Sequence, residues 1–184
     1  MTDGAAIHGR RSPAAEHRSE AVSLRDATLA DVPAITRILN EGIADRNTTL
    51  EIELKTIAQR DAWFRARGPR HPVVVAVDAS GDVLGWGSLN QFNPRAVYDH
   101  VADFSVYVAR EARGTGIGTL MLAELERRAR SIGYHKMVLA AMPENEAGLR
   151  LYTRCGFAVV GTYHEQGFRD GVWRDVLIME KILG

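Results

Sequence analysis

The segment that most constrains the fold of this chain is a glycine-rich turn, Arg113-Gly114-Thr115-Gly116-Ile117-Gly118. Before it, residues 101–108 alternate so that one strand face is wholly apolar; after it, apolar residues recur at helical spacing as far as Ile132. Alternate glycines let the backbone approach a ligand, and a helix N-terminus adds unpaired N–H donors. The turn therefore predicts a site for phosphate or pyrophosphate. The alternative is a tight turn that needs glycine only for its geometry.

The rest of the chain alternates between patterns typical of strands and of helices. Apolar or alternating stretches predict further strands at residues 22–25, 73–77, 83–91, 136–142, 157–165 and 172–183. Helical spacing and capping residues predict helices through 34–43, 56–67 and 145–154, besides the one that begins at Ile117. Because the middle strands lie in hairpins, we expect an α/β (α+β) fold with a mixed, mostly antiparallel sheet and helices on its faces.

Size and composition limit the classes of function. The chain has 184 residues, enough for one domain with a substantial core. Lys+Arg and Asp+Glu both number 23, so net charge gives no reason to expect nucleic acid or an anionic membrane as partner. No apolar run approaches the roughly 20 residues that span a bilayer. The single cysteine, Cys155, excludes a disulfide framework and fits a reducing compartment, so we expect a cytoplasmic protein.

The first 20 residues differ from the rest of the chain. They contain almost no large apolar side chain, and no apolar segment of the kind found in secretory signals follows their basic residues. Such a segment cannot bury enough surface to offset its ordering entropy. We expect a mobile tail at residues 1–20 and one folded domain at residues 21–184.

Two common nucleotide-binding motifs do not fit the glycine-rich turn. A P-loop requires Gly-Lys-Ser or Gly-Lys-Thr, and neither tripeptide occurs in the chain. A dinucleotide-binding turn requires G-x-G-x-x-G, but after Gly114 and Gly116 the third glycine, Gly118, comes one place early. The acidic residue expected about 20 positions later is also missing, since residues 132–135 are Ile, Gly, Tyr and His.

The pattern that does fit is R-x-x-G-x-G, carried by Arg113, Gly116 and Gly118. With it, residues 22–183 resemble the GNAT superfamily of acetyl-CoA-dependent N-acetyltransferases. The chain looks most similar to the phosphinothricin and methionine sulfoximine acetyltransferase branch, which includes arsinothricin resistance enzymes. The stretches that carry this resemblance are 93–99, 104–108, 145–157 and 167–176. The resemblance implies a GNAT fold in which the strands at 101–108 and 136–142 splay apart, with acetyl-CoA as co-substrate.

The resemblance also implies how acetyl-CoA would be held. The pantetheine arm would lie between the splayed strands and pair with backbone near Val106, Tyr107 and Val108. The backbone N–H groups of the turn would hold the pyrophosphate; its residues are Arg113, Gly114, Thr115, Gly116, Ile117 and Gly118. Asn145 matches a cofactor-contacting asparagine of the family, although a helix cap explains this residue at least as well.

Two residues match catalytic positions of the family. Asp103 aligns with a glutamate proposed as general base; being shorter and weakly basic, it would act through water, unless it is merely a solvated or paired strand residue. Tyr152 lies seven residues after Asn145, on the same helix face, where family members often place the tyrosine that protonates the CoA thiolate. Enzymes of this branch often have histidine there, so Tyr152 could equally be a packing residue.

The acceptor is expected to be a small amine, namely an amino acid with a second anionic or polar group. Arg95 matches an arginine of the branch's substrate loop, with Asn93 and Tyr98 beside it, and a guanidinium suits carboxylate or phosphinate. The loop at Asn47–Glu51 departs from the branch, which often has phenylalanine there, so the acceptor could differ. The alternatives are a polyamine, an aminoglycoside, a protein N-terminus, or a CoA-binding module without turnover.

Two expectations concern metals and partners. The six histidines show no metal-binding spacing and there is no C-x-x-C, so we predict no metal. Related enzymes dimerise through their C-terminal strands, and Trp173 is placed to anchor such a homodimer.

Overall fold

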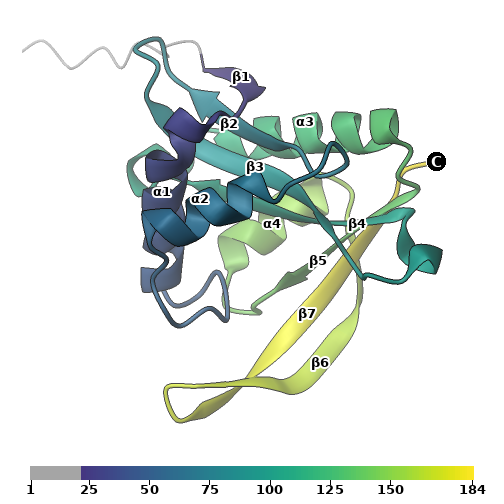
Figure 1. Cartoon of the computed structure of the whole chain (residues 1–184). Helices are drawn as coiled ribbons and strands as arrows, with labels where there is room; N and C mark the ends of the chain where they lie inside the picture. The colour runs from purple at the N-terminus through teal and green to yellow at the C-terminus, as the bar shows by residue number, and fades with distance from the viewer. Residues whose placement is uncertain (1–21) are drawn as a thin grey trace, which may run out of the picture.

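The computed structural model describes residues 22–184 and contains a seven-stranded sheet flanked by helices (Figure 1). The strands are β1 Ser23–Asp26, β2 Val73–Val77, β3 Val83–Gln91, β4 Val101–Val108, β5 Lys136–Ala141, β6 Ala158–Arg169 and β7 Val172–Ile182. The helices are α1 Val32–Ala44, α2 Ile57–Arg65, α3 Ile117–Ile132 and α4 Glu146–Arg154. The tail expected at residues 1–20 lies outside the described residues.

The sheet order is β1-β2-β3-β4-β5-β7-β6. Strands β4 and β5 pair in parallel, whereas the other neighbouring pairs of the described sheet are antiparallel. The parallel pair arises because α3 carries the chain back across the sheet between the two strands, whereas hairpin-connected neighbours run antiparallel. The predicted mixed, mostly antiparallel sheet is therefore confirmed, as is the predicted order of elements.

Local signals explain where the helices begin and end. α2 follows a capping box in which Thr56 Oγ1 accepts from the Gln59 N–H at 3.2 Å. α3 starts after Gly116, whose φ is 92°, and ends at Gly133, whose φ is 91°. Sequence patterns did not reveal three short 3-10 turns, at Leu29–Asp31 (η1), Ala96–Tyr98 (η2) and Arg110–Ala112 (η3).

The two C-terminal strands form a longer hairpin than predicted. β6 continues to Arg169, and the chain turns at Asp170-Gly171, both with positive φ (55° and 76°). This is the backbone of a tight two-residue hairpin, in which Asp-Gly is favoured. The hairpin projects from the body of the domain (Figure 1).

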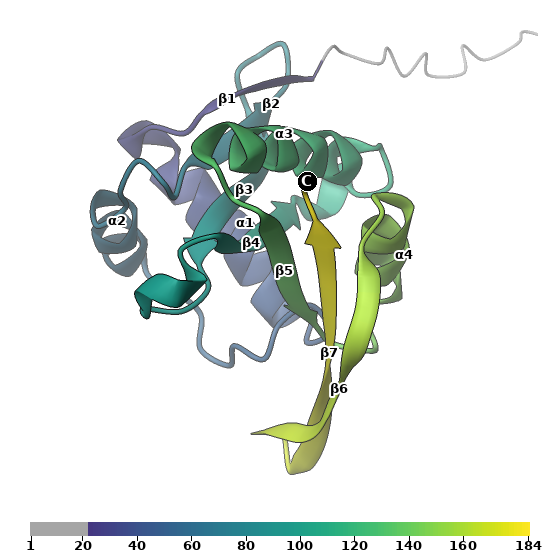
Figure 2. The same cartoon turned by 90° about the vertical axis from the view of Figure 1, so that its right-hand side faces the viewer.

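Helices cover both faces of the sheet. On one face, Trp86 of β3 packs edge-on against Trp63 of α2, with ring centroids 5.8 Å apart. On the other face, Gly85 and Gly87 leave room for α3; a Cβ on Gly87 would lie 3.0 Å from Leu125 Cδ1. Figure 2 shows α2 and α4 on opposite sides of the strands.

Strands β4 and β5 diverge soon after they begin. Their register covers only Val101 to Asp103 against Lys136 to Val138. Beyond that point, β4 stays paired with β3 and β5 stays paired with β7, so the facing edges of β4 and β5 have no strand partner within residues 22–184. The predicted splay of the central strands is confirmed (Figure 1).

Within residues 22–184, no helix is both long and apolar enough to cross a membrane.

Candidate active site

A cavity of about 1060 Å³ occupies the gap between β4 and β5, and we call it the splay cavity. It is lined by β4 from Asp103 to Val108, by residues 139–142 at the end of β5, and by parts of α4. The turn at residues 113–118, here called the glycine loop, closes one end, and residues 47–50 between α1 and α2 line another part. The sequence thus brings both predicted cofactor segments to one cavity.

The glycine loop presents a row of unpaired N–H groups. Gly114 and Gly116 have φ of 80° and 92°, a conformation that costs residues with a side chain about 1–2 kcal/mol. A Cβ on either glycine would meet nothing within 4 Å, so the space beside them is open. Among the described residues, no acceptor takes a hydrogen bond from the N–H groups of Gly114 to Gly118. The start of α3 therefore offers a concave set of donors suited to an anion.

Other residues of the glycine loop maintain its shape. A Cβ on Gly118 would lie 3.0 Å from Leu151 Cδ2, so this glycine permits α3 to approach α4 closely. Ile117 is buried in the core, and the Thr115 hydroxyl donates to the Ala112 carbonyl at 2.7 Å. These contacts give Ile117, Thr115 and Gly118 structural roles in addition to any contribution of their backbone to binding.

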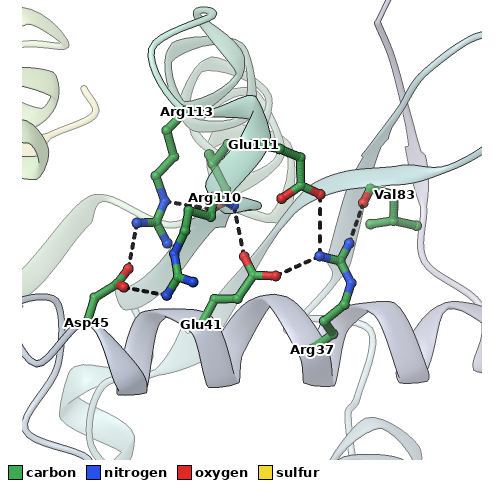
Figure 3. A network of polar contacts seen from close by, with 8 residues as sticks. Arg37, Glu41, Asp45, Val83, Arg110, Glu111 and Arg113 are labelled. Carbon is green, nitrogen blue, oxygen red and sulfur yellow. Dashed lines mark hydrogen bonds and ion pairs between the residues drawn. The ribbon is translucent and has the colours of Figure 1, made fainter.

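The side chain of Arg113 holds the glycine loop against α1 rather than pointing to a ligand (Figure 3). Its Nη1 lies 2.5 Å from Asp45 Oδ2, and its Nε donates to the Val108 carbonyl at 3.2 Å. Arg110 donates to the other Asp45 oxygen at 2.6 Å, and Glu41 Oε2 accepts from the Arg110 N–H at 2.8 Å. No sequence pattern pointed to Glu41 and Asp45, although their i,i+4 spacing places them on the same side at the C-terminal end of α1.

The predicted pantetheine segment of β4 forms one wall of the splay cavity. Val106, Tyr107 and Val108 pair with β3 on one side, and their other backbone edge faces the gap. Tyr107 is fixed by Trp86, on which its ring stacks at 5.0 Å between centroids and 18° between planes. The structure therefore supplies a rigid strand edge with free backbone groups, which is what an extended ligand needs for strand-like pairing.

Asp103 lies where β4 and β5 separate, and its side chain lines the splay cavity. Burial raises the pKa of Asp103 to about 6, and a hydrogen bond from the Phe104 backbone opposes this only in part. A carboxylate with a pKa near 6 accepts a proton far better than an ordinary aspartate does. Burial thus supplies the basicity that the sequence alone did not predict for Asp103.

Tyr152 of α4 reaches the same cavity from the opposite face of the sheet. Its ring packs against Phe104 and Phe157, with centroids at 5.9 and 6.3 Å. Burial raises the pKa of Tyr152 to about 12, with smaller contributions from Tyr107 and Asp103. The hydroxyl has no hydrogen-bond partner among the described residues, so it is a neutral donor beside the cavity.

Asn145 lines the cavity and also caps α4. Its Oδ1 accepts from the Gly148 N–H at 3.0 Å, as the alternative interpretation of this residue predicted. The cap uses the oxygen, so the amide nitrogen remains available as a donor.

None of the three residues proposed to bind the acceptor lines the splay cavity. Asn93 Oδ1 accepts from the Arg95 N–H at 3.0 Å, which is a local turn contact. The Arg95 side chain is exposed, and Tyr98 packs edge-on against Phe92 with centroids 5.6 Å apart. The structure therefore leaves Asn93, Arg95 and Tyr98 together in one surface segment that does not line the cavity of Asp103 and Tyr152.

A buried arginine of the C-terminal hairpin holds the loop between α1 and α2 over the cavity. Arg169 is 3% exposed and donates to the Thr49 carbonyl at 2.6 Å and to the Arg46 carbonyl. Leu50 of the same loop packs against Gly167, where a Cβ would come within 2.9 Å. No local pattern signals these contacts, because the partners lie more than 100 positions apart in the sequence.

Within residues 22–184, no three His, Cys, Asp or Glu side chains gather in an arrangement that could hold a metal ion.

Comparison with known proteins agrees with this geometry. Residues 36–157 match the Acetyltransferase (GNAT) family. An L-methionine sulfoximine/L-methionine sulfone acetyltransferase of Pseudomonas paraeruginosa is 36% identical over 159 residues, which cover 86% of this chain and 92% of that protein.

Solved structures show the same fold. A phosphinothricin acetyltransferase from Sinorhizobium meliloti, in complex with acetyl-CoA, superposes with a TM-score of 0.84 at 32% identity, covering 89% of each chain. A ribosomal-protein-alanine N-acetyltransferase from Brucella melitensis gives 0.82 at 35% identity, covering 87% of this chain and 99% of that one. The chain therefore belongs to the acetyltransferase (GNAT) family and is an acetyl-CoA-dependent N-acetyltransferase.

Proposed function

We propose that this enzyme moves the acetyl group of acetyl-CoA to the α-amine of a small amino acid or analogue. The observation that carries the proposal is the position of Asp103, a carboxylate with a raised pKa at the point where β4 and β5 separate. The names of similar proteins, which include acetyltransferases for methionine sulfoximine and phosphinothricin, support an acceptor of this size and class.

The residues of the splay cavity fit acetyl-CoA. The donor row at Gly114–Gly118 suits its pyrophosphate, and the free edge of β4 near Val106, Tyr107 and Val108 suits the amides of its pantetheine arm. Asn145 retains an amide donor beside the same path. When bound, acetyl-CoA supplies the thioester carbon that the acceptor amine attacks.

Asp103 removes the proton that the amine loses as it forms the new N–C bond. Near neutral pH, a carboxyl group with a pKa near 6 is mostly ionised, so it can accept this proton directly or through water. Backbone near Val108 polarises the thioester carbonyl. As the C–S bond breaks, the Tyr152 hydroxyl donates a proton to the leaving thiolate; its pKa of about 12 keeps it protonated beforehand.

The structure favours direct attack of the acceptor amine on acetyl-CoA over a mechanism in which the enzyme is first acetylated on a cysteine. Cys155 lines the splay cavity, but burial raises the pKa of its thiol, and a protonated thiol is a poor nucleophile. Cys155 is the single cysteine of the chain.

A CoA-release assay tests the proposed acceptor class. We expect release with methionine sulfoximine or phosphinothricin, and little with spermidine or an aminoglycoside. A peptide that starts with alanine tests the protein N-terminus, which the Brucella melitensis structure makes a specific second candidate. Preference for the peptide over every free amino acid would contradict the proposal, and acetyl-CoA binding without release would indicate a module without turnover.

We further propose that the enzyme is a cytoplasmic homodimer. The β6–β7 hairpin exposes large apolar side chains; Phe168 and Trp173 are 58% and 56% exposed and pack on each other at 5.0 Å. Such a projecting apolar surface is typical of an interface. Sedimentation of the wild type and of Trp173→Glu tests this proposal. If Trp173 anchors the dimer, the variant should sediment as a monomer with half the mass of the wild type. The free thiol of Cys155 fits a reducing compartment.

A further inference from the structure

A second pocket of about 420 Å³ lies between α2 and the polar face of β3 and β4. Its volume is within the roughly 300–1,000 Å³ typical of small-molecule sites. Asp103, Ser105 and Tyr107 line both this pocket and the splay cavity, so the two spaces meet at the proposed general base. We call the second space the α2 pocket.

Two side chains of the α2 pocket carry hydrogen-bond donors without acceptors. In the part of the chain that the structure describes, no acceptor pairs with the buried Nε and Nη2 atoms of Arg60 or with the buried Nε1 of Trp86. Burial of such donors costs free energy unless something accepts from them, so each needs an explanation. Among the described residues, the Arg60 side chain forms no hydrogen bond or ion pair.

The Arg60 guanidinium is nonetheless held in place. It lies 3.5 Å from the ring centroid of Trp63 and 5.2 Å from that of Trp86, and these cation–π contacts fix its plane. Desolvation lowers its pKa to about 10, so it remains a cation near neutral pH. A planar, oriented and unpaired guanidinium is suited to bind a carboxylate through two parallel hydrogen bonds.

Neighbouring charges in the α2 pocket are already engaged. Arg67 donates to the His71 carbonyl at 2.7 Å and to Asn90 Oδ1 at 3.1 Å, and also to the Leu89 carbonyl. Glu51, the acidic residue of the pocket besides Asp103, pairs with Lys55. Arg60 is therefore the cation of this pocket that is free to receive an anion.

We propose that Arg60 binds the α-carboxylate of the acceptor amino acid in the α2 pocket and thereby presents its α-amine toward Asp103. This inference rests on the proposed function and moves recognition of the acceptor's anionic group from the exposed Arg95 to Arg60. It also predicts that the enzyme discriminates free amino acids from amines and peptides, which lack that carboxylate at the reacting residue.

The test compares acids with their amides. For wild type, converting methionine sulfoximine to its carboxamide should raise KM about 10- to 100-fold, as expected for loss of a charge-assisted hydrogen bond. Arg60→Gln should raise KM for the acid by a similar factor and remove the discrimination, with KM for acetyl-CoA unchanged. Arg60→Lys keeps the positive charge but loses the two parallel donors of the guanidinium, so its KM for the acid should lie between those of wild type and Arg60→Gln.

Matched variants separate this role from structural ones. Arg65→Gln lies on the same helix but alters an exposed pair with Asp61, so it should change neither KM. Asp61→Asn, which alters the other member of that exposed pair, should likewise change neither KM. An acetyl-CoA titration of Arg60→Gln checks that the variant is folded.

Distinct outcomes overturn the two proposals. If wild type acetylates amino acids but Arg60→Gln discriminates acid from amide as before, Arg60 does not bind the carboxylate. The role of Arg60 would also be overturned if Arg95→Gln raised the KM for the acid more than Arg60→Gln does. If none of the tested amino acids causes the wild-type enzyme to release CoA, the proposed function itself fails.

Discussion

Asp45, in the turn after α1, and Arg113, at the start of the glycine loop, form an ion pair with 2.5 Å between Oδ2 and Nη1. Arg110 binds the other oxygen of the same carboxylate at 2.6 Å. Burial of Asp45 raises its pKa, but the hydrogen bonds from Arg113 and Arg110 outweigh this and lower it. The pairs thus couple the end of α1 to the loop that presents the N–H donors (Figure 3).

Asp45→Asn is expected to weaken binding of acetyl-CoA more than it weakens the fold. Partly exposed ion pairs contribute about 1 kcal/mol or less to stability, so denaturant unfolding should change little. A less ordered glycine loop should raise KM for acetyl-CoA about 3- to 10-fold. Asp61→Asn, which alters an exposed pair on α2, is the control. Equal KM values for the two variants would show that the anchor does not position the loop.

Asp103→Asn tests the general base. Loss of a positioned base should lower kcat/KM by about 100- to 10,000-fold. In the wild type, kcat/KM should fall with decreasing pH below about 6, the pKa of Asp103, and this acid limb should be absent from the residual activity of the variant. Asp99→Asn, at an exposed position before β4, should retain both the rate and the limb.

Asp103 also has a predicted effect on stability. Its pKa is raised in the folded state, so the native protein binds more protons than the unfolded chain between about pH 4 and 6. The contribution of Asp103 to the free energy of unfolding therefore falls as pH rises through that window. Near neutral pH, Asp103→Asn should stabilise the protein by roughly 1–3 kcal/mol. A variant that is less stable than wild type by urea unfolding would contradict burial as the source of the raised pKa.

Tyr152→Phe separates catalysis from packing. The substitution keeps the ring contacts with Phe104 and Phe157 and removes only a hydroxyl without a partner in the described structure. Tm should therefore change little, while kcat should fall about 10- to 100-fold if the hydroxyl protonates the thiolate. Unchanged kcat would leave Tyr152 as a packing residue. Since its pKa is about 12, no alkaline limb from this group is expected within an ordinary assay range.

Gly116→Glu tests the glycine loop as the site of the pyrophosphate. Gly81 is a matched control, since it has nearly the same φ (90° against 92°) and also lacks any neighbour within 4 Å of a new Cβ. Gly81→Glu should introduce the same backbone strain as Gly116→Glu without changing the affinity for acetyl-CoA. In Gly116→Glu, a carboxylate near the pyrophosphate should repel it by about 1 kcal/mol or more, lowering affinity about fivefold or more. Equal affinities of both variants by calorimetry would place the pyrophosphate elsewhere.

The sequence predicted those parts of the structure that depend on local signals. The order of strands and helices, the glycine-rich turn between β4 and α3, and the cap at Asn145 follow from patterning and turn chemistry, and all are present. The splay came from family resemblance rather than from periodicity, because pairing between β4 and β5 depends on contacts distant in the sequence.

Other features could not be read from the sequence. The raised pKa of Asp103 comes from burial, which several elements produce together. Arg60 lies in α2 and Arg95 in the loop before β4, and only folding shows that Arg60 enters a pocket while Arg95 stays at the surface. Likewise, Arg169 reaches Thr49 only because the C-terminal hairpin lies beside the loop that follows α1.

The most direct test of the central claim is to identify the product. The wild-type enzyme would be incubated with isotopically labelled acetyl-CoA and methionine sulfoximine, and the acceptor analysed by mass spectrometry and NMR. We expect one labelled acetyl group on the α-nitrogen for each CoA released. Labelled acetyl on another atom, or CoA release without any acetylated amino acid, would contradict it.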